Sequence, residues 1–229
     1  MTLDSCVPVL ANCLLFRDVD IHSLADILRT AQARVEEHHT GRTVRFQGDV
    51  YEDLIIVASG ELVARIDDSN GRGMIVEHFR PSSLVAGAVL TSSDPVLPVS
   101  LEALEDSVLV TIPADEMYAL FVREPAVLKS FLTDAGDKVR FLAEKLRLLR
   151  FGTLRRRIAG HLLGLARQQG TSEPKWRYGR EQTADLLGVA RPSLSRELSS
   201  MVQEGLLEHL GRDRVKLNPK ALRALLDEK

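Results

Sequence analysis

The sequence predicts an α+β protein with three parts in chain order: an antiparallel β-barrel, a long amphipathic helix, and a group of short helices with a β-hairpin. Short apolar or alternating runs, separated by clusters of Gly, Asp, Asn and Pro, fill residues 34–112. Many short strands at near-regular spacing are typical of an antiparallel sandwich or barrel. Further along the chain the apolar residues recur at helical spacing instead. We place the three parts at residues 1–121, 122–149 and 150–229.

The composition excludes several classes of protein. The chain has 229 residues, of which 45% are hydrophobic and 27% charged, as in a globular protein of one or two domains. Its two cysteines, Cys6 and Cys13, are too few for a disulfide framework or a four-thiolate iron–sulfur cluster. No apolar run of about 18 residues predicts a membrane span, and no basic segment resembles the start of a secretory signal. We therefore expect a cytoplasmic protein with no membrane partner.

The charges are divided unevenly along the chain. Residues 150–229 carry 16 Lys and Arg against 9 Asp and Glu, whereas residues 1–149 carry 14 against 23. The net charge of −2 therefore hides a basic C-terminal part joined to an acidic body. This asymmetry predicts that the C-terminal part contacts a polyanion.

The elements of the first part have local signals. Apolar residues at helical spacing follow an Asp-rich start within residues 14–30, which predicts a helix there. The runs TVRF, DLIIVAS, ELVARI, MIVEHF and SVLVTI predict strands. The segment DDSNGRG, between Ile66 and Met74, has the turn residues of a hairpin tip.

The long helix carries a narrow apolar seam. Its apolar residues follow one another at spacings of 4-3-4-3-4-3, an unbroken pattern over three heptads. The residues of this seam are Leu128, Leu132, Ala135, Val139, Leu142, Leu146 and Leu149. A strict period of 3.5 residues favours a supercoil between two chains and so predicts a homodimer. The alternative is a single helix that packs on its own β-domain.

The C-terminal part has the signals of a winged helix-turn-helix. Thr153 can cap and Gly170 can end a first helix, and Gly188 ends a second one in REQTADLLGV. The next helix begins in GVARPSLSRELSSM, because Pro192 is tolerated only in a first turn. Two short helices joined by a tight glycine turn form a helix-turn-helix unit. The segment GLLEHLGRDRVKLN adds two strands around a turn at residues 211–213, which predicts a β-wing.

The helix that begins near Arg191 has an apolar face and a polar face. Its apolar residues are Leu194, Leu198, Met201 and Val202. Arg196 lies near the centre of the opposite side. Recognition helices insert their N-terminal turns into the major groove of DNA, where arginine bonds guanine bidentately. A solvated helix face would also suit arginine and serine, but the neighbouring glycine turn and the basic charge favour DNA recognition.

With these motifs, the chain resembles the Crp/Fnr family of bacterial transcription regulators over nearly all of its length. FQGDVYEDLIIVASGELVARI is similar to the family's sensor β-barrel, and RRIAGHLLGLA and RPSLSRELSSMVQEGLL are similar to its DNA-binding domain. The resemblance implies a cyclic-nucleotide-binding-like β-barrel (a jelly roll), a central dimerisation helix and a winged helix-turn-helix. It also implies a homodimer on a two-fold symmetric operator in double-stranded DNA. RNA polymerase would be a further partner if the protein is an activator.

The resemblance carries over to single DNA-binding positions. Arg180 matches a phosphate-contacting arginine at the start of the motif's first helix. The positions that match recognition-helix contacts are Arg191, Ser193, Ser195, Arg196 and Ser199. Pro192 replaces a glutamate with which many members read a base, so we expect a different operator at that point.

The expected effector pocket departs from the cyclic-AMP type. Members that bind cyclic AMP carry Gly-Glu for the ribose and Arg-Ser for the phosphate, where this chain has Ala86-Gly87 and Leu97-Pro98. Leucine offers no cation to a phosphate and proline offers no N–H. The positions expected around this apolar pocket are Ala86, Gly87, Ala88, Leu97, Pro98, Leu142 and Ala143. We therefore expect an unidentified small effector other than cyclic AMP.

Two alternatives stay open. Some members of the family hold haem and sense NO or CO, and the candidate ligands here are His22, His38, His39, His78, Cys6 and Cys13. No pair of them has a distinctive ligand spacing, and no metal site is predicted. The chain lacks GxGxxG, GKS/GKT and CxxC motifs, so we expect no enzyme. The second alternative is a dimeric ligand-binding module that does not bind DNA.

Overall fold

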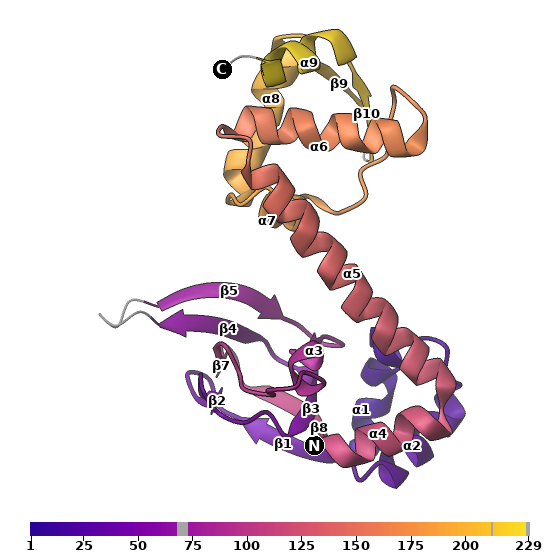
Figure 1. Ribbon diagram of the computed structural model, residues 1–229. Helices are drawn as coiled ribbons and strands as arrows, with labels where there is room; N and C mark the ends of the chain where they lie inside the picture. Colours follow the sequence, from indigo (N-terminus) through magenta and orange to yellow (C-terminus); the bar gives the residue numbers. More distant parts are fainter. Residues whose placement is uncertain (68–72, 212, 228–229) are drawn as a thin grey trace. The chain divides into compact units, whose positions relative to one another are not determined.

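The protein consists of two compact units, Met1–Gly136 and Asp137–Lys229. Its structure is a computed structural model that describes residues 1–67, 73–211 and 213–227 (Figure 1). The two units share one long helix, α5 (Pro125–Leu149). In the part of the chain that is described, no helix is both long enough and apolar enough to cross a lipid bilayer.

Short helices open the first unit. They are α1 (Leu3–Leu10), the 3₁₀ turn η1 (Leu14–Phe16) and α2 (Ile21–Thr30). The side chains of Thr2 and Asp20 cap α1 and α2, because each accepts a hydrogen bond from a backbone N–H in the first turn. The helix predicted within residues 14–30 is thus confirmed from residue 21 onward. Helix α1 was not predicted, since Pro8 lies inside it and disfavours a helix interior.

Two antiparallel sheets form the β-domain of the described chain. One sheet has the strand order β1-β8-β3-β6, and the other has the order β2-β7-β4-β5. The strands are β1 (Arg34–His38), β2 (Thr43–Arg45), β3 (Asp53–Ser59), β4 (Leu62–Asp67), β5 (Gly73–Phe79), β6 (Leu84–Val85), β7 (Ser100–Ala103) and β8 (Ser107–Pro113). Each pairing within them is antiparallel. The predicted antiparallel β-domain is therefore confirmed.

The turns between these strands explain two sequence features. Gly60, between β3 and β4, has φ +79°, and an added Cβ would lie 2.3 Å from the Ser107 Oγ atom, so only glycine fits there. Strands β4 and β5 pair with Ile66 opposite Met74, as the hairpin prediction requires. Residues 68–72 of the predicted tip, DDSNGRG, lie outside the described residues.

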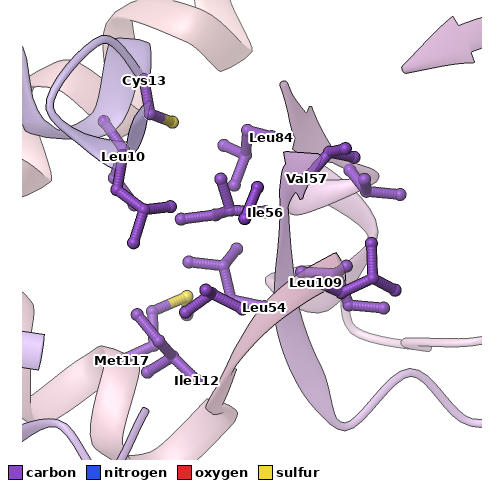
Figure 2. Packing of buried hydrophobic residues seen from close by; sticks show 14 of the residues in the cluster. Leu10, Cys13, Leu54, Ile56, Val57, Leu84, Leu109, Ile112 and Met117 are labelled. Carbon is purple, nitrogen blue, oxygen red and sulfur yellow. The ribbon is translucent and has the colours of Figure 1, made fainter. Parts of the chain in front are cut away.

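The core of the first unit lies on both faces of the sheet that contains β3. Leu54 and Ile56 of β3 are fully buried on the side of Leu10 of α1 and Met117, whereas the buried Leu109 of β8 lies on the other side with Val57 (Figure 2). Met117 belongs to helix α4 (Ala114–Arg123). Five consecutive residues of β3 are buried because α1 and α4 contact it in addition to its neighbouring strands.

A single residue separates the end of α4 from the start of α5. Glu124, between them, is extended with φ −123° and ψ 80°, because a residue before proline is disfavoured in the helical region. Pro125 can open α5 but could not continue α4. The helix predicted to carry the seam is confirmed, but it starts at Pro125 rather than at residue 122.

The second unit has the elements of a winged helix-turn-helix. They are α6 (Leu154–Gln169), α7 (Arg180–Leu186), α8 (Arg191–Gln203), β9 (Leu207–Leu210), β10 (Arg214–Leu217) and α9 (Pro219–Asp227). The hydroxyl of Thr153 caps α6, and Gly170 ends it with φ +62°, as predicted. Strands β9 and β10 pair antiparallel, so the predicted wing is confirmed; Arg212, in its turn, lies outside the described residues.

A buried polar pair joins α5 to α6 within the second unit. His161 is only 1% exposed, and its Nδ1 atom lies 2.9 Å from the Glu144 Oε1 atom. This hydrogen bond holds the pKa of the Glu144 carboxyl below its ordinary value, against the opposing effect of burial. The pair therefore favours the ionised carboxylate in the folded state.

Candidate nucleic-acid interface

The turn between α7 and α8 requires glycine at position 188. Gly188 has φ +66°, and an added Cβ would lie 3.1 Å from the Leu149 Cδ2 atom. The N–H groups of Gly188 and Val189 donate to the carbonyls of Asp185 and Ala184 and so end α7. The conformation sets the direction in which α8 leaves the turn. The predicted helix-turn-helix is confirmed at this point.

Helix α8 separates a buried face from an exposed one. Leu194, Leu198 and Met201 are at most 2% exposed and pack in the core of the second unit. The predicted DNA-contacting residues of this helix are Arg191, Ser193, Ser195, Arg196 and Ser199. All of these are exposed except the half-buried Ser193. The structure thus brings the predicted polar face together on one side of α8.

The polar side chains of this face contact one another only weakly. The Arg196 Nη2 atom lies 3.4 Å from the Ser193 Oγ atom, and Ser199 donates to the Ser195 carbonyl at 3.0 Å. The remaining N–H groups of an arginine fork are then available to another molecule. Arg196 has the chemistry needed to bond a base edge or a phosphate.

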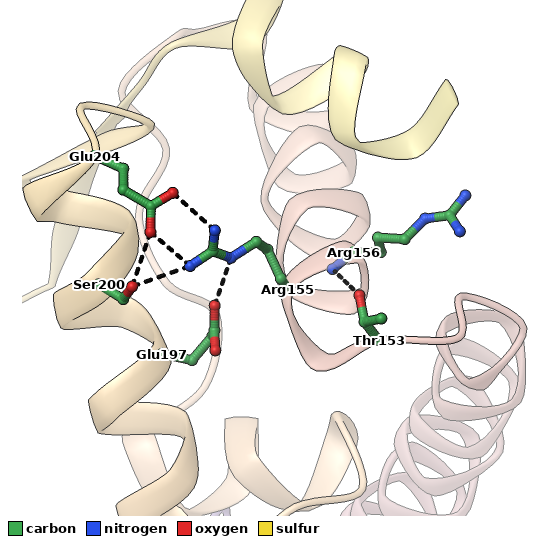
Figure 3. Close-up of polar contacts among 6 residues, drawn as sticks. All are labelled: Thr153, Arg155, Arg156, Glu197, Ser200 and Glu204. Carbon is green, nitrogen blue, oxygen red and sulfur yellow. Dashed lines mark hydrogen bonds and ion pairs between the residues drawn. The ribbon is translucent and has the colours of Figure 1, made fainter. Parts of the chain in front are cut away.

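Arg155 holds α8 from the first turn of α6, as Figure 3 shows. Its Nε atom lies 2.6 Å from the Glu197 Oε1 atom, and its two Nη atoms each lie 2.7 Å from one oxygen of Glu204. Arg155 also donates to the Ser200 hydroxyl at 3.0 Å, and Ser200 donates to Glu204 at 2.8 Å. We call these four residues the Arg155 clamp.

The Arg155 clamp has two physical effects. It fixes the C-terminal half of α8 against α6, and it neutralises carboxylates on the helix that carries the exposed arginines. Hydrogen bonds from Arg155 and Ser200 lower the pKa of Glu204, and the bonds to Glu204 and Glu197 raise that of Arg155. The sequence analysis did not find this clamp. Its only signal was a pair of glutamates seven residues apart on α8, since such residues share a helix face.

Arg180 begins α7, as predicted, but it is less exposed than its assigned role suggests. Its guanidinium lies over the Trp176 ring, 4.5 Å from the ring centroid, and burial lowers its pKa. The Arg180 Nη1 atom is buried and has no hydrogen-bond partner among the described residues. The Arg180 side chain is thus packed against an aromatic ring. A cation stacked in this way is held in one orientation.

The positive charge of Arg180 acts on a histidine of the wing. Burial and the Arg180 charge together lower the pKa of His209 on β9, so the neutral form of this histidine is favoured. Lys216 on β10 lies 3.4 Å from Glu208 in an exposed ion pair. The wing therefore adds little uncompensated positive charge through these residues.

The expected effector positions fall in different surroundings. Leu97 is 1% exposed, and its backbone N–H and carbonyl bond to Asp49 and Gly48. Ala88 and Pro98 are exposed, and Ala86 has the left-handed conformation φ 44°. Two further expected positions, Leu142 and Ala143, are exposed residues of the second unit.

Side chains of the protein itself occupy the space beside Gly87 in the expected effector pocket. An added Cβ at Gly87 would lie 3.0 Å from the Leu84 Cδ2 atom and 3.2 Å from the Phe131 Cε2 atom. Side chains of β6 and α5 thus occupy the space beside the residue that replaces the expected glutamate. With Leu97 they form an apolar surface that offers no group to a phosphate.

The haem candidates do not converge. Cys6 and Cys13 are fully buried, and the Cys6 thiol lies 3.4 Å from the Thr2 carbonyl. Burial raises the pKa of Cys6, which disfavours the thiolate that binds iron. His38 contacts Glu36 on its own strand, His78 contacts Glu61 in the turn before β4, and His22 and His39 are exposed. Among the described residues no three His, Cys, Asp or Glu gather as a metal-ligand set. These residues do not fit a haem site.

Comparison with known proteins identifies both units. Residues 35–124 match the model of the cyclic nucleotide-binding domain, and residues 156–225 match that of the Crp-like helix-turn-helix domain. The transcriptional activator protein FnrA of Stutzerimonas stutzeri is 28% identical over 91% of this chain and 83% of its own. The cyclic AMP receptor protein of Thermus thermophilus is 29% identical over 80% of this chain and 82% of its own.

A solved structure extends the similarity to three dimensions. The catabolite activator protein of Thermus thermophilus covers 93% of this chain and 98% of its own, with 25% identity and a TM-score of 0.55. Its similarity spans both units, as do the two family models. The chain is a DNA-binding transcription regulator with an effector-binding domain, not an enzyme, and it belongs to the Crp/Fnr family.

Proposed function

We propose that the protein acts as a homodimer in which α8 of each protomer reads one half of a two-fold symmetric operator. A small effector other than cyclic AMP binds the β-domain and gates this binding. The observation that carries the proposal is the polar side of α8, where Arg196 is exposed opposite the buried Leu194, Leu198 and Met201, and Arg191 is exposed at the start of the helix. The protein acts in the cytoplasm, where it reaches chromosomal DNA, and contacts RNA polymerase if it is an activator.

The division of labour between the two helices follows from their chemistry. Arg196 is exposed near the centre of the α8 polar face and can reach base edges in the major groove. Arg180 is stacked on Trp176 at the start of α7, so its position is fixed but its reach is short. Such an arginine suits a phosphate, which fixes the orientation of the protein without reading sequence.

Dimerisation is supported by the exposed seam of α5. The exposed fractions are 59% for Leu132, 68% for Val139, 56% for Leu142, 69% for Leu146 and 46% for Leu149. Leu128 packs against the core of the first unit, but these later residues do not bury themselves in either core. Exposed apolar surface costs about 25 cal/mol per Å², so a second copy of the helix is its natural cover. The alternative of a helix packed on its own β-domain explains only Leu128.

The apolar surroundings of Leu97 and Gly87 support an effector other than cyclic AMP. The family includes a relative whose name is cyclic AMP receptor protein, but a cyclic phosphate needs a cation or several N–H groups. The buried Leu97 and exposed Pro98 provide neither. An apolar effector, which must displace or extend the packing of Leu84 and Phe131 around Gly87, fits these residues better.

The two alternative functions, a haem-dependent gas sensor and a ligand-binding module without DNA binding, are less well supported. Haem is disfavoured because its candidate ligands lie apart or are buried as thiols. A ligand-binding module without DNA binding is disfavoured by the match of residues 156–225 to a Crp-like helix-turn-helix domain. An absorption spectrum of the purified protein tests the first alternative, because bound haem gives a Soret band.

The decisive experiment for the proposal begins with selection of an operator from random duplex DNA. Fluorescence anisotropy then compares the selected duplex with a scrambled one across a salt series. We expect tighter binding to the selected duplex, a two-fold symmetric consensus, and affinity that falls as salt rises. Selection of no consensus, together with binding that ignores salt, would refute the proposal.

A further inference from the structure

A groove on the second unit is lined by arginines from three helices. Its volume is about 650 Å³, which is within the range of small-molecule sites. Arg147 of α5, Arg167 of α6 and Arg223 of α9 line it. No carboxylate lies among the lining residues in the part of the chain that is described. The groove therefore concentrates positive charge in a concave surface.

Among the described residues, two of these arginines have no acidic partner. Arg147 lies 3.8 Å from Glu144, but neither Arg167 nor Arg223 forms an ion pair with a described residue. Both are exposed on the protein surface. An unpaired guanidinium retains its full capacity for a bidentate bond to a carboxylate, sulfonate or phosphate.

The floor of the groove is apolar and is kept open by glycine. Phe151 and Leu226 line the groove together with Gly164. An added Cβ at Gly164 would lie 3.6 Å from the Arg147 Nη2 atom, an ordinary contact, so the packing would admit a larger residue there. Glycine costs about 1 kcal/mol in a helix interior relative to alanine. Its presence leaves room above the α6 backbone that a side chain would fill.

No residue of α7 or α8 is among the described residues that line the groove, so it is separate from the helix that we propose reads DNA. Gly160, Gly164 and Arg167 of the groove recur at helical spacing along one side of α6. Contact with DNA through α8 therefore does not account for the arginines of the groove.

We propose that this groove binds a small organic anion with an aliphatic or aromatic body. The acid group pairs with Arg167 and Arg223, and the apolar body lies between Phe151 and Leu226 over Gly164. Both parts of the ligand are needed, because the lining combines three guanidinium groups with apolar side chains. Such a site is separate from the effector position in the β-domain.

The test uses the full-length protein and 8-anilinonaphthalene-1-sulfonate, an aromatic sulfonate that fluoresces on leaving water. We expect saturable binding at one site per chain. Octanesulfonate should displace the probe, whereas inorganic sulfate at the same concentration should not, because it lacks an apolar body. No DNA is present in this titration, so its outcome is independent of the proposed function.

Two groove variants and one control make the test specific. Arg167→Gln with Arg223→Gln removes two of the three arginine charges, and Gly164→Leu fills the floor with a good helix former. Each should weaken probe binding about tenfold or more while thermal unfolding stays cooperative. The control, Arg34→Gln with Arg42→Gln, removes two exposed charges from the first unit and should leave binding unchanged.

Three results would overturn the proposal. The first is wild-type affinity for the probe in both groove variants, which would assign the fluorescence to another apolar surface. The second is equal displacement by sulfate and octanesulfonate, which would leave only a general affinity for anions. The third comes from a separate titration with added duplex DNA: displacement of the probe there would make the groove part of the DNA-binding surface.

Discussion

Arg155 forms a bidentate ion pair with Glu204, in which each carboxylate oxygen lies 2.7 Å from one Nη atom. This pair connects the first turn of α6 to the residue that ends α8. Through its Nε atom Arg155 also bonds Glu197, so one guanidinium binds two carboxylates at the C-terminal end of the proposed recognition helix and offsets one of their two charges. The clamp thus links the orientation of α8 to its electrostatic potential.

We predict that Arg155→Ala weakens binding to any DNA duplex by about threefold to tenfold at low salt. The reason is that Glu197 and Glu204 would then be unpaired near the DNA phosphates. The loss should shrink as salt rises, since salt screens exposed charges. Anisotropy titrations at several salt concentrations measure the effect.

The control for this prediction is Arg150→Ala, which removes the same charge from an exposed neighbouring position. A further variant, Arg155→Ala combined with Glu204→Gln, should recover part of the lost affinity, because one repelling carboxylate is gone. If Arg150→Ala and Arg155→Ala lose the same affinity, only the net charge matters and the clamp has no specific role.

The α5 seam predicts a dimer that two charges can disrupt. Leu142→Asp with Leu146→Asp should give a monomer or an insoluble chain, because each aspartate would have to be buried opposite an apolar partner. Light scattering measures the mass. Thr133→Asp with Arg140→Asp adds acidic residues to the same helix away from the seam and should leave the dimer intact. A double seam variant that remains dimeric would show that α5 does not form the interface.

The sequence predicted best those elements that have a strong local signal. The caps at Thr153 and Gly170 and the turn at Gly188 were all located correctly, because capping and positive φ depend on single residues. Helix α1 was missed because Pro8 interrupts its pattern, and the start of α5 was set too early because Pro125 outweighs the apolar period.

The interactions that sequence reasoning missed are those between distant segments. Arg155 and Glu204 are 49 residues apart, and nothing in either segment specifies their pairing. The stacking of Arg180 on Trp176 was missed for a related reason, because Trp176 lies in the loop before α7 and no helical period relates the two residues. Long-range side-chain contacts follow from tertiary packing, which a local pattern does not encode.

Cyclic AMP is predicted not to bind at physiological concentration. Leu97 and Gly87 replace the expected arginine and glutamate, and Leu84 and Phe131 fill the space beside Gly87. Isothermal titration calorimetry should therefore give no measurable heat of binding. The cyclic AMP receptor protein of Thermus thermophilus serves as the positive control. A micromolar dissociation constant for this chain would show that other groups hold the phosphate.

The pair of Glu144 and His161 predicts an acid-sensitive contribution to stability. The folded state lowers the pKa of Glu144, so the contribution is present above its unfolded pKa of about 4.3 and is lost as pH falls through the lower folded value. Glu144→Gln should cost about 1 kcal/mol near neutral pH and should make the second unit's stability less dependent on pH in that acid range. Urea unfolding followed by Trp176 fluorescence measures this, since the chain has a single tryptophan.

The control for this pH-dependent unfolding measurement is Glu173→Gln, which removes the charge of an exposed carboxylate. It should leave both the stability and its pH dependence unchanged. If the free energy of unfolding of Glu144→Gln depends on pH in the same way as that of the wild type, the pair of Glu144 and His161 makes no contribution to the pH dependence of stability.

The comparison of Arg196 with Arg180 tests most directly the central claim that α8 reads bases. Arg196→Ala should cost about 1–3 kcal/mol per half-site on the selected operator and little on scrambled DNA, because base contacts carry the sequence information. Arg180→Ala should weaken both duplexes about equally and reduce the salt slope by about one unit per half-site. Trp176 fluorescence checks that the second unit stays folded, since Arg180 covers that ring.

The measurement is therefore the ratio of affinities for the selected and scrambled duplexes, obtained for wild type and both variants across one salt series. The account predicts that this ratio falls about tenfold or more in Arg196→Ala and stays near the wild-type value in Arg180→Ala. Equal losses on both duplexes for Arg196→Ala would contradict it, because α8 would then bind DNA without reading its sequence.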